Sequence, residues 1–147
     1  MKQKTKVTIF ISLLSVLLVS TISAGFYLFN KGAVDIKGSK GISVNANDLY
    51  TIYSYDSLTA NKKYTSRILV VRGVVSEISI NSKQQKIILV KTAAPGAYVN
   101  CTLEEPADNI NVSDNISIKG ICSGIGQGDA ELGIKGDVYL TRCFVSQ

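Results

Sequence analysis

An uncharged, apolar run near the N-terminus constrains this chain more than any other feature of its sequence. The 23 residues from Val7 to Phe29 carry no charge, and they follow a short tail that contains Lys2, Lys4 and Lys6. A helix of this length measures about 35 Å at 1.5 Å per residue, which is enough to cross the hydrocarbon core of a bilayer. The sequence therefore predicts a transmembrane anchor over 7–29, preceded by a basic tail over 1–6.

A cleaved signal peptide is the alternative interpretation of this run. Signal peptides have an apolar stretch of about 7–15 residues followed by small residues at the cleavage site, and Thr21 to Gly25 resembles such a site weakly. The apolar run continues beyond it, however, and Phe26, Tyr27 and Phe29 fall where an interfacial aromatic belt would lie. Length and flanking residues thus favour an uncleaved anchor.

The orientation of the anchor is expected from its short basic tail. Three lysines precede the run and three follow it within residues 31–40, so the positive-inside rule alone does not decide. A short basic tail before a single span usually stays in the cytoplasm. We therefore expect a single-pass protein of the inner (cytoplasmic) membrane whose C-terminal domain lies in the periplasm or outside the cell.

The net charge of +5 belongs to the N-terminal part of the chain. Residues 1–40 contain six lysines and one acidic residue, whereas residues 41–147 contain ten basic and ten acidic residues. A domain that binds nucleic acid draws much of its affinity from neutralising phosphates, so a neutral domain is a poor match to that function. Lys62, Lys63, Arg67 and Arg72 could form a local basic patch, although a solvated surface is the simpler interpretation; we keep Arg72 as a candidate ligand-facing residue.

After the anchor, the pattern predicts a linker, one helix and five strands. Residues 30–44 are rich in Gly, Ser and Lys and predict a linker to a domain over 45–147. Asn45 suits a helix N-cap, and apolar residues at helical spacing predict one amphipathic helix over 46–62. From Arg67 the apolar period changes to two. The expected strands are a long one that starts at Arg67 and contains Gly73, followed by strands over 86–90, 97–103, 115–123 and 137–145.

Five short strands separated by turn residues indicate a small closed barrel. A β-sandwich would usually need about seven strands. Gly73 lies in the middle of the first strand, and an interior glycine often marks a bulge or a sharp bend of the kind that closes a barrel. The expected fold class is α+β, mostly β, with a five-stranded barrel preceded by one amphipathic helix and by the N-terminal transmembrane helix.

Several segments together resemble a known family. These segments are the helix end Ala60–Tyr64, the first strand Ile68–Val75 and the later stretches Val99–Cys101, Ile118–Gly124 and Asp137–Cys143. The resemblance covers about Asn45 to Val145 and is with the tRNA-anti-like OB-fold family, which contains small, membrane-anchored bacterial proteins of uncharacterised role. It implies that the barrel is an OB fold.

The segment between Gly124 and Asp137 is longer and richer in glycine than is typical of that family. The corresponding loop of an OB fold often touches ligands, so Gly126, Gly128 and Asp129 are candidate ligand-facing residues. The glycine pattern also resembles half of a phosphate-binding loop, but a strand follows it rather than a helix, which favours a hairpin. Tyr98 is the only aromatic residue of the third strand and is a further candidate.

The three cysteines are Cys101, Cys122 and Cys143. A disulfide is allowed outside the cytoplasm, and the last two strands of an OB fold are neighbours, so Cys122–Cys143 is the candidate pair. The alternative is three buried thiols that act as small core residues. The chain has no histidine and no C-x-x-C spacing, so neither a zinc site nor another metal or cofactor is expected.

The inventory of catalytic motifs is poor. The chain lacks histidine, the commonest general base, and contains no G-x-S-x-G, H-E-x-x-H or Walker motif. We therefore expect a binding module rather than an enzyme, with an envelope protein, peptide or glycan as its partner. One alternative is an OB-fold protein that binds single-stranded nucleic acid, and another is a structural subunit of an envelope complex.

Overall fold

The computed structural model describes residues 20–23, 25, 35–129 and 131–146. The chain divides into two compact units, residues 1–35 and 36–147. Within the first unit, residues 20–23 and 25 are helical and Asp35, its other described residue, is not, and the predicted anchor over 7–29 lies mostly outside the described residues. In the described part of the chain, no helix is long and apolar enough to cross a membrane.

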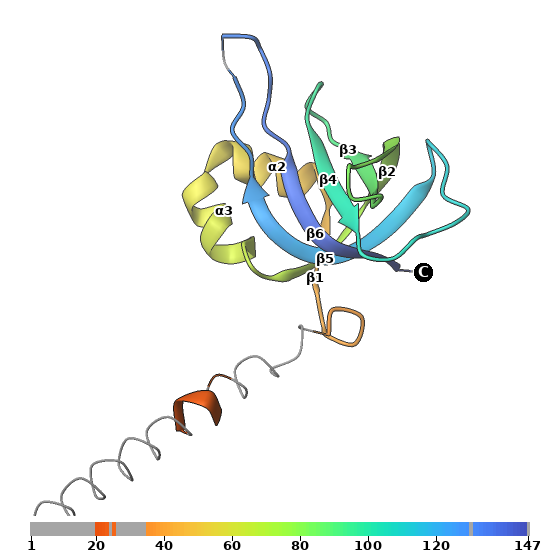
Figure 1. Ribbon diagram of the computed structural model, residues 1–147. Helices are drawn as coiled ribbons and strands as arrows, with labels where there is room; N and C mark the ends of the chain where they lie inside the picture. Colours follow the sequence, from red (N-terminus) through yellow and green to blue (C-terminus); the bar gives the residue numbers. More distant parts are fainter. Residues whose placement is uncertain (1–19, 24, 26–34, 130, 147) are drawn as a thin grey trace, which may run out of the picture. The chain divides into compact units, whose positions relative to one another are not determined.

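The second unit is a closed five-stranded barrel, as the sequence predicts (Figure 1). Its strands follow the order β2–β3–β4–β6–β5, and β5 pairs back with β2 to close the sheet. The neighbours are antiparallel except β4 and β6, which are parallel. This is the arrangement of an OB fold, and the strands are β2 (Ile68–Ile80), β3 (Lys86–Lys91), β4 (Tyr98–Leu103), β5 (Asn115–Ile125) and β6 (Val138–Ser146).

The long strand β2 bends so that it can serve two neighbours. Its first half pairs with β5, its second half pairs with β3, and the register with β3 shifts between Val75 and Glu77. The irregularity therefore lies after Gly73 rather than at it. Gly73 has another role, because a Cβ atom there would lie 2.5 Å from Cγ1 of Val90 and 3.1 Å from Cβ of Ala46. Its missing side chain lets a helix approach the strand closely.

The core fills the barrel and extends under the first helix. Alternate residues of each strand point inward, as the period of two requires. Helix α2 (Ala46–Tyr55) contacts β2, β3, β4 and β6 and covers the core with the buried side chains of Leu49 and Tyr53. Residues from all five barrel strands meet beneath it, among them Leu69, Val71, Ile88, Val90, Val99, Leu103, Ile118 and Leu140.

The single helix predicted over 46–62 is wrong in one respect, because two helices occupy the region. Helix α2 ends at Tyr55 and helix α3 (Ser57–Tyr64) follows, with Asp56 between them in an extended conformation (φ −145°, ψ 85°). The Asp56 N–H donates to the carbonyl oxygen of Ile52, and its carboxylate accepts from the N–H of Thr59 at 3.0 Å. Asp56 thus closes one helix and caps the next, because its short side chain competes for backbone donors.

The linker predicted over 30–44 is in part a piece of the domain. Residues 30–34 lie outside the described residues, but from Ile36 onward the chain belongs to the second unit, and Ile36 is 2% exposed. A short strand, β1 (Ile42–Asn45), then runs parallel to the first half of β2. Four residues are too few to show a period of two, which is why the sequence pattern did not reveal this strand.

Candidate functional site

The outer surface of strands β3, β4 and β6 forms a continuous face of polar and aromatic side chains with two aliphatic residues, Ile87 and Leu89. Buried residues alternate with more exposed ones along these strands. Lys91 lies opposite Tyr98, and Asn100 lies between Leu89 on one side and Tyr139 on the other. We call this surface the outer face, and its members are Ile87, Leu89, Lys91, Tyr98, Asn100, Thr102, Tyr139 and Thr141.

Two tyrosines flank Asn100 on the outer face. Tyr98 precedes Asn100 by two residues on β4, and Tyr139 pairs with Asn100 across the parallel β4–β6 ladder. Tyr139 is 42% exposed. The backbone N–H of Tyr98 donates to Oδ1 of Asp137 at 2.9 Å, so the start of β4 is tied to the start of β6. Tyr98, the residue predicted here to face a ligand, is therefore held by its backbone to the residue that precedes β6.

The hairpin between β5 and β6 projects from one end of the barrel next to this face (Figure 1). Its base is closed by the Gly126 N–H, which donates to the Asp137 carbonyl at 2.8 Å. Nearer the tip, Asp129 and Ile134 exchange two backbone hydrogen bonds of 2.8 Å. The Asp129 carboxylate accepts from the N–H groups of Glu131 and Leu132 at 3.0 and 3.1 Å, so it shapes the turn.

Gly126 and Gly128 of this hairpin are required by close packing. A Cβ atom at Gly126 would lie 2.7 Å from Cε2 of Tyr139, so the hairpin backbone rests directly on that ring. A Cβ atom at Gly128 would overlap the carbonyl oxygen of Ile134. The structure thus brings Tyr98, Gly126, Gly128 and Asp129 to one end of the outer face, where the glycines and Asp129 support the hairpin.

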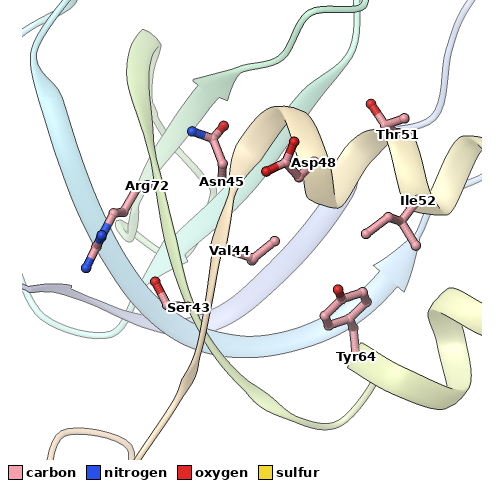
Figure 2. Close-up of a pocket in the computed structure, with 8 residues that line it drawn as sticks. All are labelled: Ser43, Val44, Asn45, Asp48, Thr51, Ile52, Tyr64 and Arg72. Carbon is pink, nitrogen blue, oxygen red and sulfur yellow. The ribbon is translucent and has the colours of Figure 1, made fainter.

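Arg72 lies apart from this group, beside a cleft next to β1 (Figure 2). The cleft has a volume of about 600 Å³, within the range of ligand pockets. Sequence reasoning missed it because its walls come from a strand and a helix end that the pattern did not reveal. We call it the β1 cleft, and its lining residues are Ser43, Val44, Asn45, Asp48, Thr51, Ile52, Tyr64 and Arg72.

A comparison with protein families now settles which group of OB-fold proteins this is. The sequence model of the family described as tRNA_anti-like matches residues 1–132. The chain belongs to the tRNA_anti-like family. The match extends from the N-terminal run through β5 and ends within the glycine-rich hairpin, so β6 lies beyond the matched residues of this tRNA_anti-like chain. A search of curated proteins found no match.

The disulfide predicted between Cys122 and Cys143 is not formed in the tRNA_anti-like domain. All three cysteines are free and buried. Cys122 pairs with Leu140 across the β5–β6 ladder, whereas Cys143 lies over Gly120, at which a Cβ atom would be 2.5 Å from its Sγ. Neighbouring strands were foreseen, but the register of this ladder sets Cys122 opposite Leu140 and not opposite Cys143.

The three thiols are core groups rather than exposed nucleophiles. Sγ of Cys122 lies 3.3 Å from the Tyr53 hydroxyl. A hydrogen bond with Cys143, together with burial, raises the pKa of the Cys101 thiol well above its usual value, and a protonated thiol is a poor nucleophile and metal ligand. Within the residues that the structure describes, no cluster of three or more His, Cys, Asp or Glu side chains is placed to hold a metal ion.

Proposed function

We propose that this chain is a membrane-anchored binding module whose OB-fold domain lies outside the cytoplasm and binds an envelope protein, peptide or glycan on the outer face. The observation that carries the proposal is the pair of tyrosines, Tyr98 and Tyr139, on either side of Asn100 and next to the hairpin. OB folds bind oligosaccharides and oligonucleotides on this face and with the adjoining loops.

The chemistry of the outer face favours an uncharged, extended ligand. Tyrosine rings offer apolar area together with a hydroxyl group, and their few rotatable bonds limit the entropy lost on binding. Asn100 and Thr102 add donors and acceptors in line with the rings. Lys91 is the single charged member of this face. Sugars and peptide backbones match such a surface better than a polyanion does.

The anchor and its orientation are supported by the sequence. The uncharged run over 7–29 has the length of a membrane span, and the six-residue basic tail before it favours a cytoplasmic N-terminus. The neutral charge of residues 41–147 fits a domain whose partner is not a polyanion.

Binding of single-stranded nucleic acid is the second candidate, and one observation favours it. Lys91 lies opposite Tyr98, so an aromatic ring has a basic neighbour, as in surfaces on which bases stack. One lysine provides little phosphate neutralisation, however, and the domain carries no net charge. We therefore rank this function below the first.

Site-specific photocrosslinking in bacterial cells distinguishes these functions. A photoreactive amino acid replaces Thr102 on the outer face, and in a control chain it replaces Leu58, which is 75% exposed on α3 and lies outside this face. We expect an adduct from position 102 that protease or glycosidase treatment shortens and nuclease does not. A nuclease-sensitive adduct would support the second candidate, and equal labelling at both positions, or none at either, would contradict the outer face as a binding site.

Substitution of the tyrosines tests the same face in the crosslinking assay. Tyr98→Ala combined with Tyr139→Ala is expected to lower the yield of the position-102 adduct about tenfold, because exposed tyrosines often dominate binding energy. Tyr55→Ala is the matched control, since Tyr55 is 92% exposed on α2 and lies outside the outer face. An unchanged yield in the double variant would contradict the assigned role of the tyrosines.

A further inference from the structure

Strand β1 has an open edge. Among the residues that the structure describes, β1 pairs with β2 alone and forms the end of the strand order. Three consecutive residues of this strand, Ser43, Val44 and Asn45, line the β1 cleft. The cleft therefore follows the strand edge at which backbone groups have no strand partner, and such an edge is a template for a further strand.

The two sides of β1 offer different surroundings at this edge. Val44 points toward Ile52 and Tyr64 on the helical side of the cleft (Figure 2). Asn45 pairs with Arg72 of β2, so their side chains share the opposite side. An added strand would present its successive residues to these two sides in turn, because side chains alternate along a strand.

Tyr64 contributes an unused hydrogen-bonding group to the helical side. The residue is 3% exposed. The centroid of its ring lies 6.3 Å from the ring centroid of Tyr53 and 5.0 Å from Nζ of Lys63. In the described part of the chain its hydroxyl has no hydrogen-bond partner, and Figure 2 shows it directed into the cleft between Val44 and Ile52. No buried polar side-chain atom of the described residues lacks a hydrogen-bond partner, so this hydroxyl is accessible to water from the cleft and free to bond with an occupant.

Arg72 contributes a positive charge to the opposite side, and among the described residues it forms no ion pair, not even with Asp48, which also lines the cleft. The side chain is exposed, and the two salt bridges in that part of the chain join Lys37 to Glu105 and Arg142 to Glu104. A guanidinium group binds carboxylates through two parallel hydrogen bonds, which makes an acidic side chain its natural partner.

We propose that the open edge of β1 accepts an extended peptide of a partner protein as an additional strand. The peptide places an apolar or hydrogen-bonding side chain against Val44 and Tyr64, and an acidic side chain against Arg72. Since these two sides are opposite, the two peptide residues are separated by an odd number of positions. This site lies on a different surface from the outer face, so it adds a second binding surface to the proposed function.

Selection from a phage-displayed library of random peptides of about nine residues tests the site, with the full chain held in lipid nanodiscs. We expect the selected peptides to pair an acidic residue with an apolar one at odd separation. Their affinity should fall about tenfold on Arg72→Gln, a loss typical of one charge-assisted contact. Arg67→Gln is the matched control, because Arg67 is exposed just before β2 and lies outside the β1 cleft.

Backbone methylation of a selected peptide tests whether it binds as a strand. N-methyl groups introduced one position at a time should abolish binding at alternate positions, because only every second N–H of an edge-paired strand faces its neighbour. Tyr64→Phe, which keeps the ring, should weaken binding about threefold without changing the unfolding temperature. Insensitivity to methylation, or failure to select any peptide, would overturn the proposal.

The same variants separate this proposal from the outer-face function. Peptides that bind equally well to the Arg72→Gln and Tyr64→Phe chains but not to the Tyr98→Ala, Tyr139→Ala chain occupy the outer face. That result would overturn strand addition at β1 and leave the proposed function intact. If the position-102 adduct is absent while methylation-sensitive peptide binding persists, strand addition at β1 is supported and the outer-face function is overturned.

Discussion

The Tyr53 hydroxyl links three parts of the domain. Tyr53 is 1% exposed on α2, and its hydroxyl lies 3.1 Å from Oγ1 of Thr65, just after α3, and 3.3 Å from Sγ of Cys122 on β5. Burial and the hydrogen bond with Cys122 raise its pKa well above the usual tyrosine value. The helix pair is thus held over the barrel by a phenol that must remain protonated.

Tyr53→Phe should therefore change the alkaline stability of the domain. Loss of the hydroxyl is expected to lower the free energy of unfolding by about 1 kcal/mol at neutral pH, as for a typical buried hydrogen bond. Because the folded-state pKa is raised, the contribution of Tyr53 is complete below the unfolded-state pKa of about 10 and is lost as the pH rises above it. Urea unfolding between about pH 8 and pH 11 should show a steeper decline for the natural chain than for Tyr53→Phe.

The quantity to follow is the difference in free energy of unfolding between the natural chain and Tyr53→Phe. The two chains share every other ionisable group, so the effects of those groups on the free energy of unfolding cancel to first order. Stability curves that stay parallel above pH 10 would show that the Tyr53 phenol ionises equally in folded and unfolded chains.

Of the residue-level predictions, the cysteine pairing failed because strand register decides which side chains meet. Tyr98 lies on an exposed face, as its place on the third strand suggests, whereas Gly126 and Asp129 shape the hairpin. The Cys122–Cys143 pairing assumed that neighbouring strands align their cysteines. The sequence offers no way to see the strand register, which pairs Cys122 with Leu140.

At the scale of elements, the barrel strands were predictable because each has a period of two over six or more residues. The break between α2 and α3 was missed because apolar residues continue at helical spacing across it. Asp56 carried a usable signal, since an aspartate three residues before Thr59 is a common N-cap arrangement. Strand β1 carried none, because one inward valine in four residues shows no pattern.

Asp56→Ala tests the junction of the two helices. The hydrogen bond from Thr59 lowers the pKa of the Asp56 carboxyl, so the charged form is the one that caps α3. The substitution should lower the unfolding temperature by roughly 4 °C and speed amide exchange in the first turn of α3. Asp48→Ala is a suitable comparison, because Asp48 is an exposed acidic residue in the first turn of α2 that caps no helix.

The effect of Asp56 should also depend on pH. A lowered folded-state pKa means that its contribution is present above the unfolded-state value of about 4 and is lost as the pH falls below it. The difference in unfolding temperature between the natural chain and Asp56→Ala should therefore shrink in acid. A difference that persists unchanged at about pH 2 would show that the carboxylate is not the capping group.

At the scale of the whole molecule, the fold class could be predicted from the number of strands and from the family resemblance. The β1 cleft could not be predicted from the sequence. Its walls come from β1, α2, the end of α3 and β2, which are brought together only by the folded chain. The charge division between residues 1–40 and 41–147 is visible in the sequence alone.

The anchor yields a prediction about membrane association. The full chain should remain in the membrane fraction after an alkaline carbonate wash, and Leu14→Lys with Leu17→Lys should release it, because each central lysine costs about 2.5–3.5 kcal/mol in a span. Alkaline phosphatase fused after Gln147 should be active, since that enzyme needs an oxidising compartment. Activity of a cytoplasm-only reporter at the same position would reverse the proposed orientation.

The contacts of residues 36 and 37 determine how a pulling force would enter the domain. Ile36 is buried, Nζ of Lys37 lies 2.6 Å from Glu105 and 4.7 Å from the centre of the Phe144 ring, and the Lys37 carbonyl accepts from Lys119 at 2.8 Å. Tension applied from the N-terminal side would meet these contacts before it reached β1. The load would be shared with residues of β5, β6 and the segment after β4, so β1 would keep its hydrogen-bond register with β2 under such tension.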